Sequence, residues 1–412
     1  MSIDVKMAWR NIWRNTRRTI LTICAIAFAS LLLVFMLSFQ FGSYATMINT
    51  AVKIQTGHLQ IQAQEYHDKK DIRLVVPRPE QVAAVLAGMP QIESYTFRGQ
   101  SFSLISSRER TYGVVVAGID PVSEAAVSRL KSLIHRGEYF AEDDADLALV
   151  GHLLARNLRV DIGDELTVLG QGRDGSIAAT VVEIKGIYRS GIDDFDRSSI
   201  QIPLKTFQTV YSMQGAVHEV VVIANALAEV AKIKTALKTA LPGIESHKPL
   251  TVMDWNELMP GLRQSIEMDL VGGLIFYLLL ILVVAFSILN TFLMAIFERT
   301  RELGVLMAIG TTPGRLTKIL LLESMIMTAM GIAAGIIVGS LITLYFQSYG
   351  IDFSGASELL SQFGITGRMY PKLSWLSATS GPLVVLAITF AAALYPALKV
   401  RQMQPVEAMR AT

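Results

Sequence analysis

Four long apolar runs constrain the fold of this 412-residue chain more than any other feature of its sequence. The first run, Thr19 to Phe41, has no ionised side chain over about 23 residues, which is roughly 35 Å of helix and enough to cross a bilayer. Only 17% of the residues are charged and 51% are hydrophobic, which excludes a typical soluble protein. The sequence therefore predicts a membrane protein with spans at 19–42, 269–297, 317–346 and 376–398.

The distribution of basic residues predicts the orientation. By the positive-inside rule, loops rich in Lys and Arg stay in the cytoplasm. Residues 347–375 contain only Arg368 and Lys372 as basic residues. We therefore expect an inner-membrane protein with cytoplasmic termini and residues 43–268 in the periplasm. The basic residues that indicate this lie before the first run, between the second and third, and after the fourth: Lys6, Arg10, Arg14, Arg17, Arg18, Arg299, Arg301, Arg315, Lys318, Lys399, Arg401 and Arg410.

Residues 4–18 have the pattern of an amphipathic helix lying on the membrane surface. Trp9 and Trp13 share one helical face with Val5, Ile12 and Thr16, and basic residues surround the other face. Tryptophan at headgroup level with a basic polar face is typical of an interfacial anchor on an anionic leaflet. The net charge of +2 is not pooled in one domain, and no aromatic residues alternate with the basic ones, so a nucleic-acid partner is not expected.

Between the first two spans the pattern changes to that of an α+β domain. Apolar and polar residues alternate at 57–64, 112–119, 180–187 and 218–224, which predicts strands. Residues 79–88 and 226–241 have helical spacing instead. The length suffices for one or two hydrophobic cores. The single cysteine, Cys24, lies in the first apolar run, so no disulfide within the chain can stabilise this domain.

The segment from Glu298 to Gly314 interrupts two apolar runs with charge. An Asp, Lys or Arg at a membrane centre costs about 2.5–3.5 kcal/mol, so the charged residues at its start mark where one span leaves the bilayer. Leu303, Leu306, Met307 and Ile309 then predict a short amphipathic helix, ended by Gly310. Its apolar face requires a partner.

This segment resembles the coupling helix of the FtsX-like permeases of ABC transporters, the family of MacB, LolC and LolE. The family pattern is approximately E-R-x-x-E-(I/L)-G-x-(L/M)-x-A-(I/L)-G. The tail from Pro405 to Arg410 also resembles the family's closing P-x-E-A-L-R. The residues that match the coupling pattern are Glu298, Arg299, Glu302, Leu303, Gly304, Leu306, Ala308, Ile309 and Gly310.

The resemblance implies a MacB-like (type VII) permease with a porter part and an inserted lobe in its periplasmic domain. It also implies that Arg299 and Glu302 orient the coupling helix and that Gly304 lets the partner surface approach. The implied order is a cytoplasmic amphipathic helix (1–18), first span (19–42), periplasmic α+β domain (43–268), second span (269–297), coupling helix and loop (298–316), third span (317–346), periplasmic loop (347–375), fourth span (376–398) and cytoplasmic tail (399–412).

The third span contains a glycine repeat and one carboxylate. Gly331, Gly335 and Gly339 recur every four residues and clear one face for another helix, either of the same chain or of a second copy. Glu323 lies about one turn beyond Lys318. A matching Glu in the family favours a structural anchor over a proton site, with its carboxylate reaching back to the interface.

No catalytic chemistry is expected from the chain itself. It has no G-x-x-x-x-G-K-[ST], so ATP and Mg²⁺ should bind to a separate ATPase and not to this subunit. The six histidines have no metal-binding spacing. The acidic run Asp193, Asp194 and Asp196 lacks calcium-loop spacing and is interpreted as a solvated turn. We expect no cofactor, metal or catalytic site in this chain.

The leading hypothesis is a permease subunit that couples ATP hydrolysis by two cytoplasmic ATPase subunits to movement of its periplasmic domain. It would release lipoprotein or another lipophilic substrate from the inner membrane, with a second permease (identical or homologous) and a periplasmic carrier or adaptor as further partners. One alternative is a MacB-like drug or peptide exporter that works with an adaptor. Another is an FtsX-like mechanotransmitter that activates a periplasmic enzyme. A membrane-bound enzyme or sensor lacks a catalytic constellation in this sequence.

Aromatic and methionine side chains near the outer ends of the first two spans suggest a substrate cleft open to lipid. Such side chains are adaptable and suit an apolar ligand, but ordinary lipid-facing surface gives the same pattern. The residues are Phe35, Met36, Phe39, Met268 and Ile275.

The predicted orientation can be tested by labelling. A cysteine introduced at Ser176, in the expected periplasmic domain, should react with an impermeant thiol reagent in intact spheroplasts. A cysteine at Thr312, in the expected cytoplasmic loop, should not react. The reverse pattern would refute the orientation.

Overall fold

The structure is a computed structural model that describes residues 3–244, 246, 248–352 and 368–401. The described residues divide into two compact units, which are treated separately below. The membrane unit contains residues 3–44, 266–352 and 368–401, and the α/β unit contains residues 45–265 apart from 245 and 247. Part of the predicted 347–375 loop and most of the predicted tail, including Pro405 to Arg410, lie outside the described residues.

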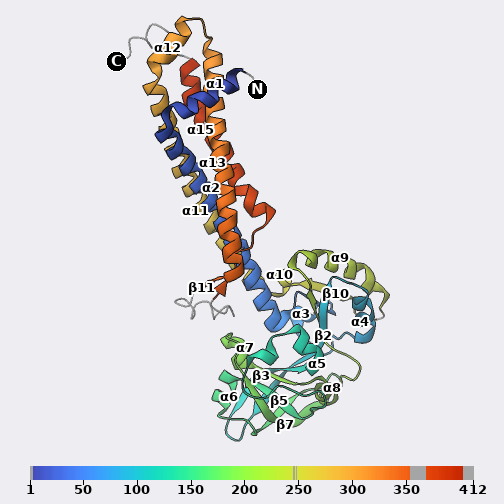
Figure 1. Cartoon of the computed structure of the whole chain (residues 1–412). Coiled ribbons are helices and arrows are strands. Elements are labelled where there is room, and N and C mark those ends of the chain that lie inside the picture. Colours follow the sequence, from blue (N-terminus) through green and yellow to red (C-terminus); the bar gives the residue numbers. More distant parts are fainter. Residues whose placement is uncertain (1–2, 245, 247, 353–367, 402–412) are drawn as a thin grey trace. The chain divides into compact units, whose positions relative to one another are not determined.

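Long helices dominate the membrane unit, and α1, α12 and the end of α15 lie at one end of their bundle (Figure 1). Four helical segments of the described chain are long and apolar enough to span a membrane. This arrangement, with the α/β unit between the first and second of them, confirms the predicted fold class. The helices are α1 (Ile3–Ile12), α2 (Thr16–Ala51), α11 (Pro260–Glu298), α12 (Thr300–Ala308), α13 (Pro313–Tyr349) and α15 (Trp375–Arg401), with a short hairpin of β11 (Ile351–Asp352) and β12 (Arg368–Met369).

Two helices extend beyond the predicted ends of their spans. The predictions placed an end at residue 42 and a start at residue 269, whereas α2 continues to Ala51 and α11 begins at Pro260. An apolar run marks the part of a helix that suits hydrocarbon, but only helix-breaking residues mark where the helix ends. Gly42 remains helical, and a Cβ there would lie 2.2 Å from the carbonyl oxygen of Tyr370.

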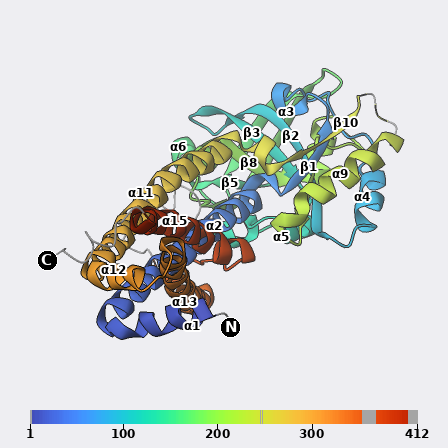
Figure 2. The same ribbon diagram turned by 90° about the horizontal axis from the view of Figure 1, so that it is seen from above.

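The spanning helices share one apolar core. It joins Ile26 and Leu33 of α2 to Ile288 and Phe292 of α11 and to Val385 of α15. The N-terminal helix α1 runs across the end of α13 (Figure 2) and buries Ala8 and Ile12. The single face predicted for 4–18 is therefore divided, because Ile12 packs within the chain while Trp9 and Trp13 are exposed and touch edge to face.

The α/β unit contains a closed β-barrel. Its strands pair in the order β2–β3–β8–β5–β7–β6, and β6 returns to pair with β2. The inward side chains, among them Ile105, Val116 and Val168, form one hydrophobic core. The barrel strands are β2 (Ile92–Ser106), β3 (Thr111–Ile119), β5 (Leu147–Gly151), β6 (Glu165–Gln171), β7 (Ile177–Tyr188) and β8 (Ser199–Pro203), with β4 (Ile134–Gly137) paired to β7.

A second lobe of this unit is a four-stranded sheet that shares β2 with the barrel, in the order β10–β1–β9–β2. Helices α4 and α9 supply Val82, Leu86, Ile233 and Leu237 to its separate core, so the unit has two cores. The remaining elements are β1 (Leu59–Ala63), β9 (Glu219–Ala224), β10 (Leu250–Asp254), α3 (Tyr66–Lys69), α4 (Pro79–Ala87), α5 (Pro121–Val127), α6 (His152–Leu158), α7 (Asp193–Ser198), α8 (Leu204–Val210), α9 (Val230–Ala240) and α10 (Trp255–Leu258).

All the strands and helices predicted from periodicity in this region are present, as β1, β3, β7 and β9 and as α4 and α9. The longest strand, β2, was not predicted. Its buried positions include Thr96, Arg98 and Ser103. Because these residues are polar, the strand lacks the alternation of apolar and polar residues that predicts a strand. Each has a partner: Thr96 bonds Ser123 at 2.8 Å, and Ser103 bonds Tyr211 at 2.7 Å.

The interpretation of Asp193, Asp194 and Asp196 as a solvated turn was wrong for Asp196. Asp196 lies within α7, and its side chain is fully buried and accepts hydrogen bonds from the backbone N–H of Ser190 at 2.9 and 3.1 Å. Nδ1 of His152 lies 2.9 Å from its Oδ2. The acidic composition of this run suggested that all three side chains are solvated, but a carboxylate with such hydrogen-bonding partners can be buried.

A buried ion pair joins β2 to α5. Arg98 donates to both carboxylate oxygens of Glu124, at 2.9 and 2.7 Å, and the two side chains are only 6% and 3% exposed. Removing one member of such a pair leaves an uncompensated charge, which costs more than removing both.

We therefore expect Glu124→Ala to lower the free energy of unfolding by about 3–5 kcal/mol, and Arg98→Met with Glu124→Leu to lower it less than the single change does. Unfolding of the α/β unit in the detergent-solubilised chain measures both. The control is Arg136→Met, which removes an exposed ion pair with Asp161 and should change stability by less than about 1 kcal/mol. Equal losses in the single and double variants would contradict the prediction.

Candidate functional site

The candidate site is the short helix α12 between the second and third spans. α11 ends at Glu298, and Arg299 breaks the helix with φ −104° and ψ 8°. α12 then ends before Gly310, whose φ of +103° favours glycine, and Pro313 begins α13. The predicted short helix ended by glycine is thus present.

α12 has two different faces. Leu303 and Met307 pack inward against Ile296, Leu316 and Leu320, and Leu303 is only 3% exposed. The opposite side exposes apolar side chains that nothing in the described chain covers: Val305 at 43%, Leu306 at 37% and Ile309 at 78%. The inner face fixes the helix to the bundle, and the outer face is free to bind.

The role that the resemblance implies for Gly304 does not fit this geometry. Gly304 is buried with Leu303 on the inner side, so it does not face a partner. Ala308 and Gly310 are on the exposed side. Gly304 instead lies where α12 packs against the rest of its own chain.

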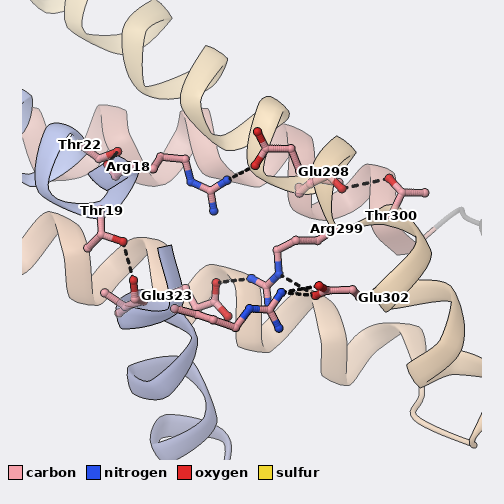
Figure 3. A network of polar contacts seen from close by, with 11 residues as sticks. Arg18, Thr19, Thr22, Glu298, Arg299, Thr300, Glu302 and Glu323 are labelled. Atoms are coloured by element: carbon pink, nitrogen blue, oxygen red, sulfur yellow. Dashed lines mark hydrogen bonds and ion pairs between the residues drawn. The ribbon is translucent and has the colours of Figure 1, made fainter. Parts of the chain in front are cut away.

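The charged residues of the coupling pattern all have partners inside the chain (Figure 3). Glu298 accepts a hydrogen bond from Arg18 at 2.7 Å, and Glu302 pairs with Arg14. Arg299 lies between two carboxylates, with Nη1 3.1 Å from Glu323 and Nε 3.5 Å from Glu302. The Arg14 guanidinium holds the pKa of Glu302 below its ordinary value, so this carboxylate is ionised at neutral pH.

Glu323 of α13 is buried and bonds side chains of the same chain. Its side chain is 10% exposed and bonds Asn11 of α1 at 2.6 Å in addition to Arg299. The pairing of these carboxylates with Asn11, Arg14 and Arg18 could not be predicted from sequence, because the partners lie about 280 or more positions away along the chain.

The glycine repeat of α13 faces α2 of the same chain. A Cβ on Gly331 would lie 2.7 Å from Cβ of Ile26, one on Gly335 would lie 2.5 Å from the carbonyl oxygen of Ala27, and one on Gly339 would lie 3.1 Å from Cα of Leu31. Backbones approach this closely only where side chains are absent.

The five residues suggested for a substrate cleft lie on two helices, with Phe35, Met36 and Phe39 on α2 and Met268 and Ile275 on α11. Phe35 stacks with Phe39 at 6.4 Å and meets Phe346 of α13 edge to face, and Met36 is half-buried. On α11, Met268 and Ile275 are 68% and 57% exposed.

Two hydrogen bonds that were not predicted from sequence connect α2 to α11 near these residues. Tyr44 donates to Asp269 at 2.5 Å, and Tyr277 donates to Gln40 at 2.8 Å.

No cluster of three or more His, Cys, Asp or Glu that could hold a metal occurs within 3–244, 246, 248–352 and 368–401. His218 instead bonds within the α/β unit, where its Nδ1 accepts from the N–H of Gln100 at 2.9 Å. Burial lowers the pKa of His218 to about 4, so the ring is neutral.

Two family models match the chain. The MacB-like periplasmic core domain matches residues 19–240, and the FtsX-like permease C-terminal model matches residues 274–405. The first covers more than half of the chain, and the second includes α12. The chain belongs to the MacB- and FtsX-like family of ABC transporter permeases.

Curated relatives agree with this membership, and part of one solved structure is also similar to this chain. The chain is 22% identical to the lipoprotein-releasing system transmembrane protein LolC of Neisseria meningitidis, over 95% of this chain and 94% of that protein. It is 24% identical to LolC of Xylella fastidiosa over 73% and 74% of the two chains. The periplasmic region of MacB from Actinobacillus actinomycetemcomitans matches 52% of this chain and 94% of that structure, with a TM-score of 0.38 and 14% identity.

The glycine contacts of this permease predict a position-dependent effect of one added methyl group. Gly→Ala favours a helix by about 1 kcal/mol, but forcing an atom into a packed interface costs about 1–3 kcal/mol. Gly335→Ala should therefore lower the thermal unfolding temperature in detergent, because the methyl meets Ala27 and Ser30.

Gly272→Ala on α11 is the matched control, since a Cβ there has no atom within 4 Å among the described residues. It should leave the unfolding temperature unchanged or raise it. Equal effects at the two positions would show that the α2–α13 contact does not depend on this glycine.

Proposed function

We propose that this chain is the permease subunit of a transporter in which a separate cytoplasmic ATPase drives movement of the periplasmic core domain. The observation that supports the proposal is the apolar outer face of α12, made of Val305, Leu306 and Ile309. The face lies between charged residues that do not suit hydrocarbon, so lipid does not account for its exposure. A groove on a soluble ATPase would cover it.

The inner face of α12 supports the same role. A docking element has to transmit force, and α12 is tied to its bundle by Leu303, Met307 and the ion pairs of Arg299 and Glu302. A partner that moved α12 would therefore displace the ends of the spans with it. Because the sequence has no P-loop, ATP and Mg²⁺ would bind to the partner.

The assembly that we propose contains two ATPase subunits and two permeases, identical or homologous. We place α12 and both termini in the cytoplasm and the α/β unit in the periplasm, on the basis of the Lys and Arg distribution. The same distribution is compatible with a bacterial inner membrane.

For cargo we propose lipoprotein, released to a periplasmic carrier. The support is that the Neisseria LolC, a lipoprotein-releasing protein, aligns over nearly the full length of both chains. A macrolide export protein, MacB of Chlorobaculum tepidum, is 35% identical over 30% of this chain, which is the basis for the alternative of drug or peptide export with an adaptor.

Replacing Leu306 by Asp tests the docking face. A buried unpaired charge costs several kcal/mol, and each 1.4 kcal/mol is tenfold in affinity, so ATPase association or coupling should fall by about a hundredfold or more. Expression and membrane insertion should stay near normal, because Leu306 is on the exposed side of α12. Co-purification of the ATPase, stimulated ATP hydrolysis and lipoprotein release from spheroplasts measure the effect.

Thr312→Asp is the matched control. It adds the same charge in the adjoining loop, at the residue preceding α13, where Asp is a favourable N-cap. This variant should keep the ATPase and full activity. If Leu306→Asp also keeps both, α12 is not the coupling element.

A further inference from the structure

We propose that the N-terminal helix α1 is the second half of the coupling element. In this inference, which rests on the proposed function, α1 and α12 move as one unit through two links. Arg14, in the turn that follows α1, pairs with Glu302 of α12. Asn11 of α1 shares Glu323 of α13 with Arg299, the residue before α12. Movement of α12 then passes through α1 into α2. Arg14 and Asn11 are positioning residues and need not touch the ATPase.

The first support is that α1 and the start of α2 are bound by charge to α12 and its flanking helices. Arg14 pairs with Glu302 on α12, and Arg18 reaches Glu298 at the end of α11. At the other end of α1, Asp4 lies 3.0 Å from Arg315 and 3.4 Å from Lys318, at the start of α13.

A membrane anchor alone does not account for these pairs. The exposed rings of Trp9 and Trp13 suit the lipid interface, as the sequence predicts. An anchor of that kind would leave its basic side chains to anionic lipid headgroups. Here Arg14 and Arg18 instead bind carboxylates of the same chain, and Ala8 and Ile12 are buried.

The second support is the buried carboxylate of Glu323, which α1 and the start of α12 share. Its Oε1 accepts from Asn11 at 2.6 Å, and its Oε2 lies 3.1 Å from Nη1 of Arg299. Shifting either helix alone would leave a buried carboxylate with part of its partners missing. Such a loss is costly at a buried charge, so the low-energy movement carries α1, Arg299 and Glu323 together.

A small cavity beside this carboxylate, lined by both polar and apolar side chains, gives the cluster room for water. Its volume is about 40 Å³, and Thr19, Thr22, Thr291 and Ser324 are among its lining residues. A site of about 10–15 Å³ or more holds one water when polar partners are present. Nε of Arg299 is buried and makes no hydrogen bond to the described residues, so water there would complete its hydrogen bonding.

The third support is the helical connection from α1 to α2. The turn Trp13–Asn15 between them is flanked by residues in the right-handed helical region, and residues 3–24 contain no glycine or proline. Oγ1 of Thr19 donates to the carbonyl oxygen of Ile12 at 2.5 Å across the turn. α2 then continues without interruption to Ala51. A displacement of α1 is therefore passed along α2.

A charge exchange at positions 14 and 302 tests the proposal in the complex purified with its ATPase. Arg14→Glu and Glu302→Arg each place like charges together, and each should lower stimulated ATP hydrolysis about fivefold or more while the ATPase still co-purifies, because the outer face of α12 is unchanged. The double variant restores opposite charges at 14 and 302 but leaves the new basic side chain at 302 beside Arg299, so it should recover part of the lost rate and exceed both single variants. Lys6→Glu makes the same change at an exposed residue of α1 for which no ion pair is described, and should have no effect.

A reversible crosslink tests whether the two helices move as one unit. Arg14→Cys and Glu302→Cys are combined with Cys24→Ser and bridged with a bifunctional methanethiosulfonate reagent. The bridged complex should hydrolyse ATP at the stimulated rate, and cleavage with dithiothreitol should lower the rate as the single reversals do. The Cys24→Ser complex treated with both reagents is the control.

The inference is overturned if either single reversal keeps full activity, if the double variant is no better than the singles, or if the bridged complex is inactive. Failure of the proposed function has a different result: the unaltered complex would then contain no ATPase.

Discussion

A carboxylate inside a helix bundle must be neutralised where it lies, and the burial of Glu323 imposes much of the arrangement around it. Arg299 reaches it because the chain leaves the helical conformation after Glu298, and Asn11 reaches it because α1 lies across the end of α13. The break before α12 and the position of α1 thus both bring a hydrogen-bonding partner to the carboxylate of Glu323. The apolar contacts of Leu303 and Met307 then fix which side of α12 stays exposed.

The fold could be predicted from sequence wherever periodicity and burial agree. The four apolar runs indicated four spans because hydrocarbon admits little else, and β1, β3, β7 and β9 were predicted from alternation. β2 was missed because its buried Thr96, Arg98 and Ser103 are polar, and their partners are side chains distant along the chain. The closure of the barrel depends on that strand, so it could not be predicted either.

The candidate site was predicted as a local element but not as a network. The charge, spacing and terminal glycine of 298–310 are local signals, and they indicated a short helix between two spans. The ion pairs that hold this helix join residues about 280 or more positions apart. The basic face of 4–18 had been interpreted as binding to anionic lipid, so no partner within the chain was sought for it. The direction of each face of α12 likewise depends on packing partners, which is why Gly304 was assigned to the wrong side.

The shared strand β2 makes the barrel lobe an insertion whose two ends are neighbours. The chain leaves the sheet lobe after Arg98 and returns at His218, whose N–H donates to the carbonyl oxygen of Arg98 at 2.9 Å. The pairings of β1, β9 and β10, and those of β2 with β9, all lie outside residues 99–217. Evolution can therefore lengthen or shorten the barrel lobe without altering the register of the sheet, provided that α5 is kept, because Glu124 neutralises the buried Arg98 and Val127 packs on β9.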